Sequence, residues 1–387
     1  MRTSEIIVFL LIALGIYGLA NFYILRRGWQ ALAGYPSLRT AFLIVLGSLI
    51  LAYPLGRALG RASGGVVSDA FVRSGSFYMA LMLYLFLLLI AVDIFRLANA
   101  FLHFFPEGFA ANPHKTGLIA FIAVMGTGLG VVIGGYVNAL HPRLQTLEID
   151  INKPAGDNLR SLNIAMASDI HLGTVMGSRR LERIVKRLNI LEPDIVLLPG
   201  DIVDESVSQA EEEKMISCLR SIKARLGVFS VPGNHEYFGG LEKNLEYLRR
   251  GGVRVLQDEA VLINGAFVLA GRKDPTALRY RESRLPIQKI LEKAPADPGL
   301  PVILLDHQPV RLQEAEEAGI DLQLSGHTHA GQLFPFNLIN KRIWEQNWGY
   351  LKKGTTQYYV SCGVGTWGPP VRTCSIPEIV RIKVSFH

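Results

Sequence analysis

The chain has 387 residues, which is enough for two structural units. Hydrophobic residues make up 49% of it and the mean hydropathy is +0.26, values too high for an ordinary soluble enzyme, so membrane segments are expected. The net charge of +7 and the pI of about 9.3 suit anionic partners. The basic residues form no long run and no stripe with aromatic residues, so nucleic acid is not an expected partner.

Residues 1–142 are expected to form a transmembrane domain of about four helices. The apolar segments cover residues 6–25, 40–56, 74–95 and 116–140. The second segment is the shortest, and we expect Pro54 to interrupt it. The alternative for the first segment is a signal peptide, but no small-residue cleavage site stands out. Asp93 and Arg96, near the end of the third segment, form either a pair at the membrane interface or a functional polar site.

These segments predict an integral, multi-pass protein of the cell membrane. Four spans place both chain ends on the same side of the bilayer. Lysine and arginine are distributed almost evenly between the loops of the two sides. Their small asymmetry favours a cytoplasmic position for the domain that follows.

After residue 142 the pattern changes to short apolar strands that alternate with charged helices. This alternation predicts an α/β domain over residues 143–387. The expected strands are 147–151, 162–168, 195–198, 228–231, 261–269, 302–305, 322–324, 358–361 and 379–384, and the expected helices are 178–191, 205–226 and 242–250.

Residues of the types that bind metals recur directly after five of these strands. They are Asp169 and His171, then Asp201, then Asn234 and His235, then His307 beside Asp306, and finally His327 and His329. Open α/β sheets bind ligands outside the carboxyl ends of their strands, so we expect these side chains to converge. Each motif alone has an ordinary alternative, such as an Asx turn or a helix cap. Their shared position after strands favours a single site.

Two divalent metal ions are the cofactors that this set of residues predicts. Carboxylates with imidazoles suit Mn, Fe, Zn or Mg, and the sequence does not distinguish among them. Two cations can clamp a phosphate and activate a water for attack. No cysteine stands among these residues, so a structural zinc cluster is not expected. The cysteine count of three favours free thiols, with a Cys362–Cys374 bridge as the alternative.

The combined motifs resemble the signature of the calcineurin-like metallophosphoesterase superfamily. The resemblance covers about residues 145–387 and rests on Asp169-x-His171, Gly200-Asp201, Gly233-Asn234-His235-Glu236, His307 and Gly326-His327-x-His329. It implies a four-layer α/β/β/α sandwich. By the family pattern, one metal would be held by Asp169, His171 and His329, and the other by Asn234, His307 and His327. Asp201 would bridge the metals, and His235 would be the catalytic residue that protonates the leaving group or steadies the transition state.

The stretch from Ser361 to Arg372, with Pro377-Glu378-Ile379 after it, is similar to the membrane-associated YkuE/YaeI-like branch of that superfamily. Members of the branch are described as phosphodiesterases, and a relative hydrolyses the pyrophosphate of a UDP-linked diacylglucosamine. Cys362 stands where an arginine is more often expected, so no substrate-binding residue is assigned.

Two further segments bear on the substrate. The apolar residues 333–339 come directly after the last ligands, and aromatic and basic residues follow them at 341–353. This composition suits either the membrane interface or a segment folded back onto the core. The arginine-rich residues 279–284 either meet phosphates or begin a solvated helix.

We therefore expect a membrane-anchored, two-metal phosphoesterase that hydrolyses phosphodiester or pyrophosphate bonds by a metal-activated hydroxide. The favoured partner is a phosphorylated, lipid-linked small molecule at the bilayer. The alternative is a catalytically silent membrane scaffold or sensor with the same fold. The sequence identifies neither the natural substrate nor the oligomeric state.

Overall fold

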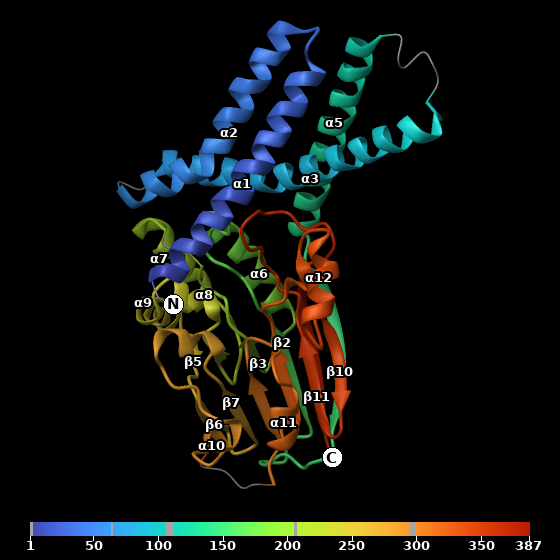
Figure 1. The fold of residues 1–387 in the computed structure, drawn as a ribbon. Helices are drawn as coiled ribbons and strands as arrows, with labels where there is room; N and C mark the ends of the chain where they lie inside the picture. Colours follow the sequence, from blue (N-terminus) through green and yellow to red (C-terminus); the bar gives the residue numbers. More distant parts are fainter. Residues whose placement is uncertain (1–2, 63–64, 106–111, 205–206, 295–298) are drawn as a thin grey trace. The chain divides into compact units, whose positions relative to one another are not determined.

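The structure is a computed structural model that describes residues 3–62, 65–105, 112–204, 207–294 and 299–387 (Figure 1). The chain divides into two compact units. The first contains Met1–Val137 with Gly368–Val371, and the second contains Asn138–Trp367 with Arg372–His387. Each unit is described below by itself.

The described residues of the first unit form four helices, namely α1 (Thr3–Ala31), α2 (Pro36–Ala62), α3 (Val66–Leu102) and α5 (Pro113–Ala139). Within the described residues, three helices are long and apolar enough to cross a membrane: Pro36–Arg61, Val66–Leu102 and Pro113–Ala139. Helix α1 covers the first expected segment, and its crossing of the membrane stays a prediction. The first three helices extend beyond both expected bounds, and α5 begins three residues earlier and ends one residue earlier than expected.

The expected interruption at Pro54 is wrong, because α2 continues through this residue. A proline inside a helix removes one backbone hydrogen bond, but neighbouring helices can support the chain there. Helix α1 gives this support, because the hydroxyl of Tyr17 donates a hydrogen bond at 2.8 Å to the carbonyl of Ile50, four residues before Pro54. Helix α3 also packs closely against α2. A Cβ atom on Gly75 of α3 would collide with the backbone nitrogen of Tyr53, so only glycine permits this approach.

Asp93 on α3 is the centre of a polar cluster in the first unit. Its carboxylate forms an ion pair with Arg27 of α1 and accepts a hydrogen bond from the Tyr23 hydroxyl at 2.6 Å. The Nη1 atom of Arg96 lies 3.9 Å from Oδ1, the other carboxylate oxygen of Asp93. The i,i+3 pair considered from the sequence is thus the longer of the two arginine contacts. A cavity of about 150 Å³ lies beside this cluster.

The second unit contains two six-stranded sheets among its described residues. The first sheet has the order β1-β12-β2-β3-β4-β5 and the second has the order β10-β11-β9-β8-β7-β6. The strands of the first sheet are β1 (Arg143–Ile151), β12 (Glu378–Phe386), β2 (Ser161–Met166), β3 (Ile195–Leu198), β4 (Val228–Ser230) and β5 (Arg254–Val255). Those of the second are β10 (Gly349–Lys353), β11 (Thr356–Val360), β9 (Leu322–Ser325), β8 (Val302–Leu305), β7 (Phe267–Gly271) and β6 (Glu259–Ile263).

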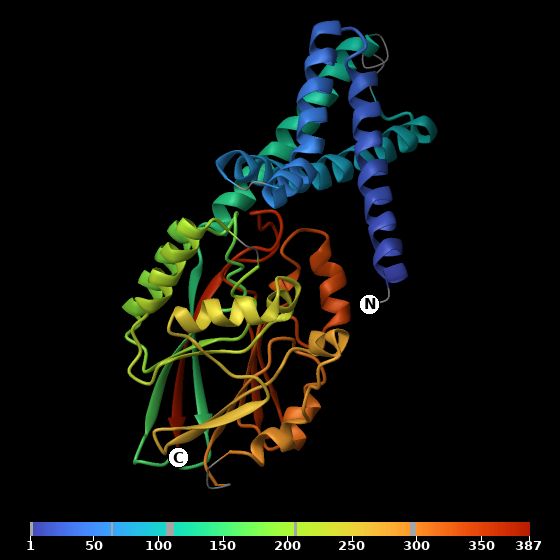
Figure 2. The same cartoon turned by 90° about the vertical axis from the view of Figure 1, so that its left-hand side faces the viewer.

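The main core lies between the two sheets and joins buried side chains from both, such as Ile164, Leu197, Ile303 and Leu324. A second core lies between the first sheet and helices α6 (Ser178–Ile190), α7 (Gln209–Arg220) and α9 (Leu241–Arg250). A third lies between the second sheet and helices α10 (Ile287–Leu291) and α11 (Gln313–Glu317). Figure 2 shows these helices on the outer sides of the unit. The predicted two-sheet α/β domain is therefore confirmed.

The single strand expected over residues 261–269 is wrong, because this run forms the antiparallel hairpin β6–β7. Asn264 and Gly265 make its turn, with φ of 46° and 68°. Asn-Gly is the preferred pair for a two-residue turn of this kind, because both positions need positive φ. The helix expected over 205–226 is also too long. Helix α7 covers Gln209–Arg220, and residues 205–206 lie outside the described part.

Candidate metal centre

The predicted ligands all lie at one end of the two sheets, directly after strands. In the first sheet, Asp169 and His171 follow β2, and Asp201 follows β3. Asn234 and His235 begin the short helix α8 (Asn234–Phe238) after β4. In the second sheet, His307 follows β8, and His327 and His329 follow β9. The carboxyl ends of these strands therefore bring the side chains together, as expected for parallel strands.

The backbone at five of these residues is in the left-handed region. The values of φ are 53° for Asp169, 55° for His171, 54° for Asp201, 72° for His327 and 49° for His329. Residues other than glycine rarely adopt this conformation, because Cβ crowds the backbone. Such strained residues are typical of functional sites, where the surrounding structure holds them in place.

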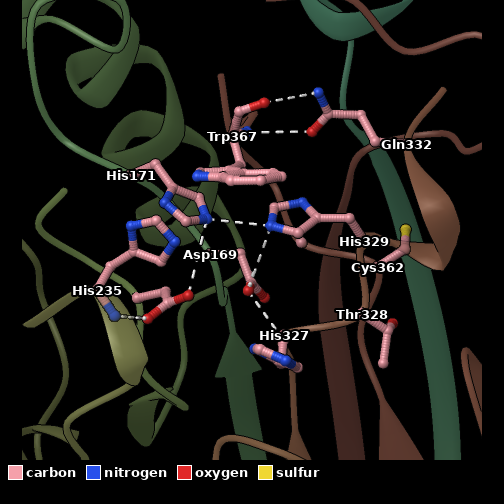
Figure 3. A network of polar contacts seen from close by, with 12 residues as sticks. Asp169, His171, His235, His327, Thr328, His329, Gln332, Cys362 and Trp367 are labelled. Carbon is pink, nitrogen blue, oxygen red and sulfur yellow. Dashed lines mark hydrogen bonds and ion pairs between the residues drawn. The ribbon is translucent and has the colours of Figure 1, made fainter. Parts of the chain in front are cut away.

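The first candidate metal-binding group consists of Asp169, His171 and His329, which are all buried (Figure 3). The Nε2 atoms of the two histidines are 3.0 Å apart, and His329 Nε2 lies 3.6 Å from Asp169 Oδ1. Asp169 Oδ2 and His171 Nδ1 are buried without a hydrogen-bond partner among the described residues. Buried polar atoms are costly to leave unpaired, so this convergence of nitrogen and oxygen donors fits a divalent cation.

The second group consists of Asp201, His307 and His327, with Asn234 beside them. Asp201 Oδ2 and Asn234 Oδ1 lie 3.1 Å and 3.2 Å from His307 Nε2. His307 Nδ1 donates a hydrogen bond to the carbonyl of Pro199 at 2.7 Å. Since a carbonyl only accepts, this bond fixes the proton on Nδ1 and turns Nε2 toward the other donors, as in histidines that bind metals.

Asp201 links the two groups. Its Oδ2 atom is 3.1 Å from His307 Nε2 in the second group and 3.9 Å from His171 Nε2 in the first. Its Oδ1 atom accepts the backbone N–H of His235 at 2.8 Å, which fixes the carboxylate. These donors also fit a pair of cations that share one carboxylate.

Burial governs the pKa values of the first group. It raises the pKa of Asp169 to about 6, an effect that the charge of His307 opposes. Burial also lowers the pKa of His171 to about 4 and that of His329 well below its usual range. Neutral imidazoles are the form that binds metals, so the buried environment suits the proposed role.

In the second group, burial competes with the charges of neighbouring side chains. Burial would raise the pKa of Asp201, but the charge and hydrogen bond of His307 hold it well below its usual range. Burial would lower the pKa of His307, but Asp201 raises it well above the usual value. For His327 burial dominates and, with the charge of His307, lowers the pKa to about 3.

His235 is held by a residue that the sequence analysis missed. Its Nδ1 lies 2.6 Å from Asp204 Oδ1. Burial opposes protonation of this imidazole, but the hydrogen bond to Asp204 and the charges of Asp201 and Asp204 raise its pKa to about 9. The signal was available in the sequence, because Asp204 follows Asp201 by three residues in the same strand-end loop.

Glu236, quoted before only as part of a motif, fixes the loop that carries Asp201. Its carboxylate accepts four backbone N–H groups, from Asp201, Ile202, Val203 and Gly233, at 2.7–3.1 Å. Burial raises its pKa to about 7, which the hydrogen bonds from Val203 and Gly233 counteract. The strands β3 and β4 are thereby tied together at the ends where the ligands stand.

Arg372 is a fully buried side chain behind His329. Its guanidinium donates hydrogen bonds to the carbonyls of Cys362 and Gly365, at 2.8 Å and 2.6 Å. It also lies 3.2 Å from His329 Nδ1. A planar guanidinium with five N–H groups can satisfy several carbonyls at once, so Arg372 fixes the loop beside this ligand.

Aromatic rings flank His235 at the edge of the centre. The ring centroids of Phe238 and Trp367 lie 5.5 Å and 6.0 Å from that of His235, and both rings are more than half exposed. The backbone of Trp367 is clamped by the Gln332 side chain, which donates at 2.9 Å and accepts at 3.0 Å (Figure 3). An exposed indole is thus held in a fixed position near the candidate site.

The other residues singled out in the sequence have structural roles. Arg284 forms a two-pronged pair with Asp306, at 2.6 Å and 2.8 Å, and no helix begins within the described residues 279–284. Arg279 and Arg281 are exposed, and their contact with phosphates stays a prediction. Cys362 and Cys374 are free thiols, so the alternative of a bridge is wrong. Cys362 is buried, and its Sγ donates to the carbonyl of Ile376 at 2.9 Å.

The fold and the site define an α/β protein with two adjacent metal-binding groups at the carboxyl ends of its strands. Residues 162–331 match the family described as calcineurin-like phosphoesterase. A metallophosphoesterase of Aquifex aeolicus is 36% identical over 263 residues, which cover 66% of this chain and 97% of that protein. The chain belongs to the calcineurin-like metallophosphoesterase family.

Further relatives support the branch expected from the sequence. YkuE of Bacillus subtilis is 27% identical over 259 residues, covering 63% of this chain and 87% of YkuE. A bovine protein named as a transmembrane protein with a metallophosphoesterase domain is 34% identical, covering 69% of this chain and 63% of that protein. The alignment with a Helicobacter pylori metallophosphoesterase covers 65% of this chain and 66% of the relative.

Proposed function

We propose that this chain is a membrane-anchored, two-metal phosphoesterase that hydrolyses phosphodiester or pyrophosphate bonds. The observation that carries the proposal is the position of Asp201 between two groups of nitrogen and oxygen donors. Its Oδ2 atom lies 3.1 Å from His307 Nε2 in one group and 3.9 Å from His171 Nε2 in the other. A shared carboxylate of this kind is the arrangement that hydrolases with paired metal ions use.

The residues that would hold the metals divide as the family pattern implies. Asp169, His171 and His329 would bind one cation, and Asn234, His307 and His327 would bind the other, with Asp201 shared. When bound, two divalent cations would neutralise charge on the phosphoryl oxygens and acidify the attacking water. Mn, Fe, Zn and Mg are all compatible with these donors.

His235 would supply a proton at the leaving oxygen. Because its Nδ1 is engaged by Asp204 at 2.6 Å, Nε2 is the ring nitrogen left to exchange a proton with a substrate. Asp204 fixes both the orientation and the tautomer of the ring, as orienting carboxylates do in other enzymes that use histidine. The exposed rings of Phe238 and Trp367 border the same imidazole and would exclude water from one side of the substrate.

The favoured substrate is a phosphorylated molecule linked to a lipid. Two features support this choice, namely the apolar helices at the N-terminus and the exposed aromatic rings beside His235. The name of the bovine relative also pairs a transmembrane region with this domain type. We further propose a cytoplasmic position for the domain from the distribution of basic residues in the loops.

Asp201→Asn tests the proposal on the purified full-length protein. We expect turnover of bis(p-nitrophenyl) phosphate to fall by about 1,000-fold, which corresponds to roughly 4 kcal/mol of lost transition-state stabilisation. Unchanged turnover would overturn the hydrolase assignment. Elemental analysis separates this function from a silent scaffold with the same fold, because a scaffold would retain no divalent metal after gentle purification.

A further inference from the structure

Helix α12 (Phe336–Ile343) leaves an unusual apolar stripe uncovered. Within this fully described helix no side chain is buried. Phe336, Ile339 and Ile343 follow the i, i+3, i+7 spacing of one helix face, and 48%, 53% and 68% of their surfaces are exposed. Such a face is normally packed against another surface. One alternative from the sequence was that residues 333–339 fold back onto the core. Leu333 does so, because it is buried, but the side chains of α12 do not.

Asn340 of α12 and Trp344, directly after the helix, contact the loop that carries the proposed metal ligands. Asn340 Nδ2 donates to the carbonyl of Thr328 at 3.0 Å. The ring of Trp344, directly after the helix, lies 5.2 Å from that of His327 in an edge-on contact. The helix is thus held in a defined orientation in which Phe336, Ile339 and Ile343 stay exposed.

Exposed basic and aromatic residues lie close to this stripe in the sequence. Lys341 and Arg342 are exposed on the same helix. Trp348 and Tyr350 follow, with 50% and 43% of their surfaces exposed. The indole N–H of Trp348 donates a hydrogen bond to the carboxylate of Glu378 at 3.1 Å, and the rest of the ring is accessible. Aliphatic side chains with lysine, arginine and interfacial tryptophan form the composition that binds the surface of an anionic bilayer.

We propose that α12, together with Phe334 and Trp348, is an interfacial segment that inserts its apolar stripe into the bilayer surface. The partner is a membrane with anionic headgroups, which complement Lys341 and Arg342. Only residues 140–142 separate α5, a candidate span, from β1. This linker is at most about 14 Å long, so the membrane is within reach of the domain. The inference concerns membrane contact and does not depend on the hydrolytic activity.

Quenching of tryptophan fluorescence by brominated lipid tests this inference. The full-length protein is reconstituted in vesicles of phosphatidylcholine and phosphatidylglycerol in equal parts, with brominated acyl chains. The fluorescence of Trp348 is obtained by subtracting the signal of the Trp348→Phe variant from that of the natural protein. We expect this contribution to be quenched in the natural protein. The double variant Ile339→Asn, Ile343→Asn should lower the insertion equilibrium at least about tenfold, since two apolar side chains lose their burial.

Ile190→Asn is the matched control, because Ile190 is 77% exposed at the end of α6, outside the stripe. It should leave the quenching unchanged. Thermal unfolding and metal content verify that the double variant is folded. Absence of Trp348 quenching in the natural protein, or equal quenching in the double variant, would overturn the inference. A doubled particle mass in the natural protein that is absent in the double variant would overturn the inference, because a second copy of the chain would then cover this face. A protein that shows quenching but no phosphodiester turnover would contradict the proposed function alone.

Discussion

The carboxylate of Glu236 accepts the backbone N–H of Asp201 at 3.1 Å, so the proposed shared ligand is held by a side chain outside the two candidate metal-binding groups. Three other backbone N–H groups converge on the same carboxylate. Because all four donors belong to the loops after β3 and β4, Glu236 sets the distance between those loops.

Replacing Glu236 with Gln should destabilise the protein and weaken metal binding. The amide would present N–H groups to backbone donors, which leaves buried hydrogen bonds unmade at a cost of about 2–3 kcal/mol. Metal affinity should fall by roughly 10–100-fold, as for other residues that position ligands. Thermal unfolding and metal titration measure the two effects. The control is Glu242→Gln, a change at an exposed residue of α9, and an equal effect of both changes would contradict the assignment.

Asp204→Asn should separate catalysis from metal binding. The change removes the charge that orients His235, and we expect kcat to fall by about 100-fold. The loss should be larger for an alkyl leaving group than for an aryl one, because the alkoxide needs a proton more. Metal content should stay at the natural level. The donors of His171, Asp204 and His235 lie within 4.8 Å of one another, so loss of one metal equivalent would instead indicate a third cation there.

Arg284→Met should be strongly destabilising, because it leaves the buried carboxylate of Asp306 without its main partner. Both side chains of this pair are less than 10% exposed. Breaking a buried pair typically costs about 3–5 kcal/mol. Arg225→Met breaks the exposed Arg225–Asp194 pair and should cost less than about 1 kcal/mol. Denaturant unfolding of the two variants measures the difference, and similar losses would show that burial does not govern these pairs.

Removal of metal should lower the thermal stability of the second unit. The Nε2 atoms of His171 and His329 approach each other to 3.0 Å, and a cation between such donors would stabilise the folded chain. A chelator should therefore lower the melting temperature, and Mn²⁺ should restore it. His171→Ala should abolish most of this response. A melting temperature indifferent to both treatments would show that these donors hold no metal.

The positions of the ligands could be predicted from the sequence because each one follows a short apolar strand. The rule that ligands bind at strand ends needs no knowledge of which strands are neighbours. Asp204 and Glu236 were missed as site residues because their roles depend on contacts across loops. Periodicity reports which residues are buried, but it does not report which backbone N–H groups a carboxylate accepts.

Two errors in the predicted fold have different causes. Residues 261–269 were expected as one strand because the apolar run hid the Asn264-Gly265 turn, although that pair is itself a strong hairpin signal. Pro54 was expected to interrupt a helix because helix propensity describes an isolated helix without its neighbours. The packing of α2 against α3 at Gly75 depends on the tertiary structure, which a single segment does not contain.

The left-handed backbone at Asp169, His171, Asp201, His327 and His329 sets function against stability within this chain. Each of these residues would be conformationally more relaxed as glycine, and all of them except His327 also add a polar group to a buried place. Selection for thermostability in the absence of metal should therefore favour changes at these five positions. With metal present, the same changes should lower the melting temperature, because they remove the stabilisation that a bound cation would supply.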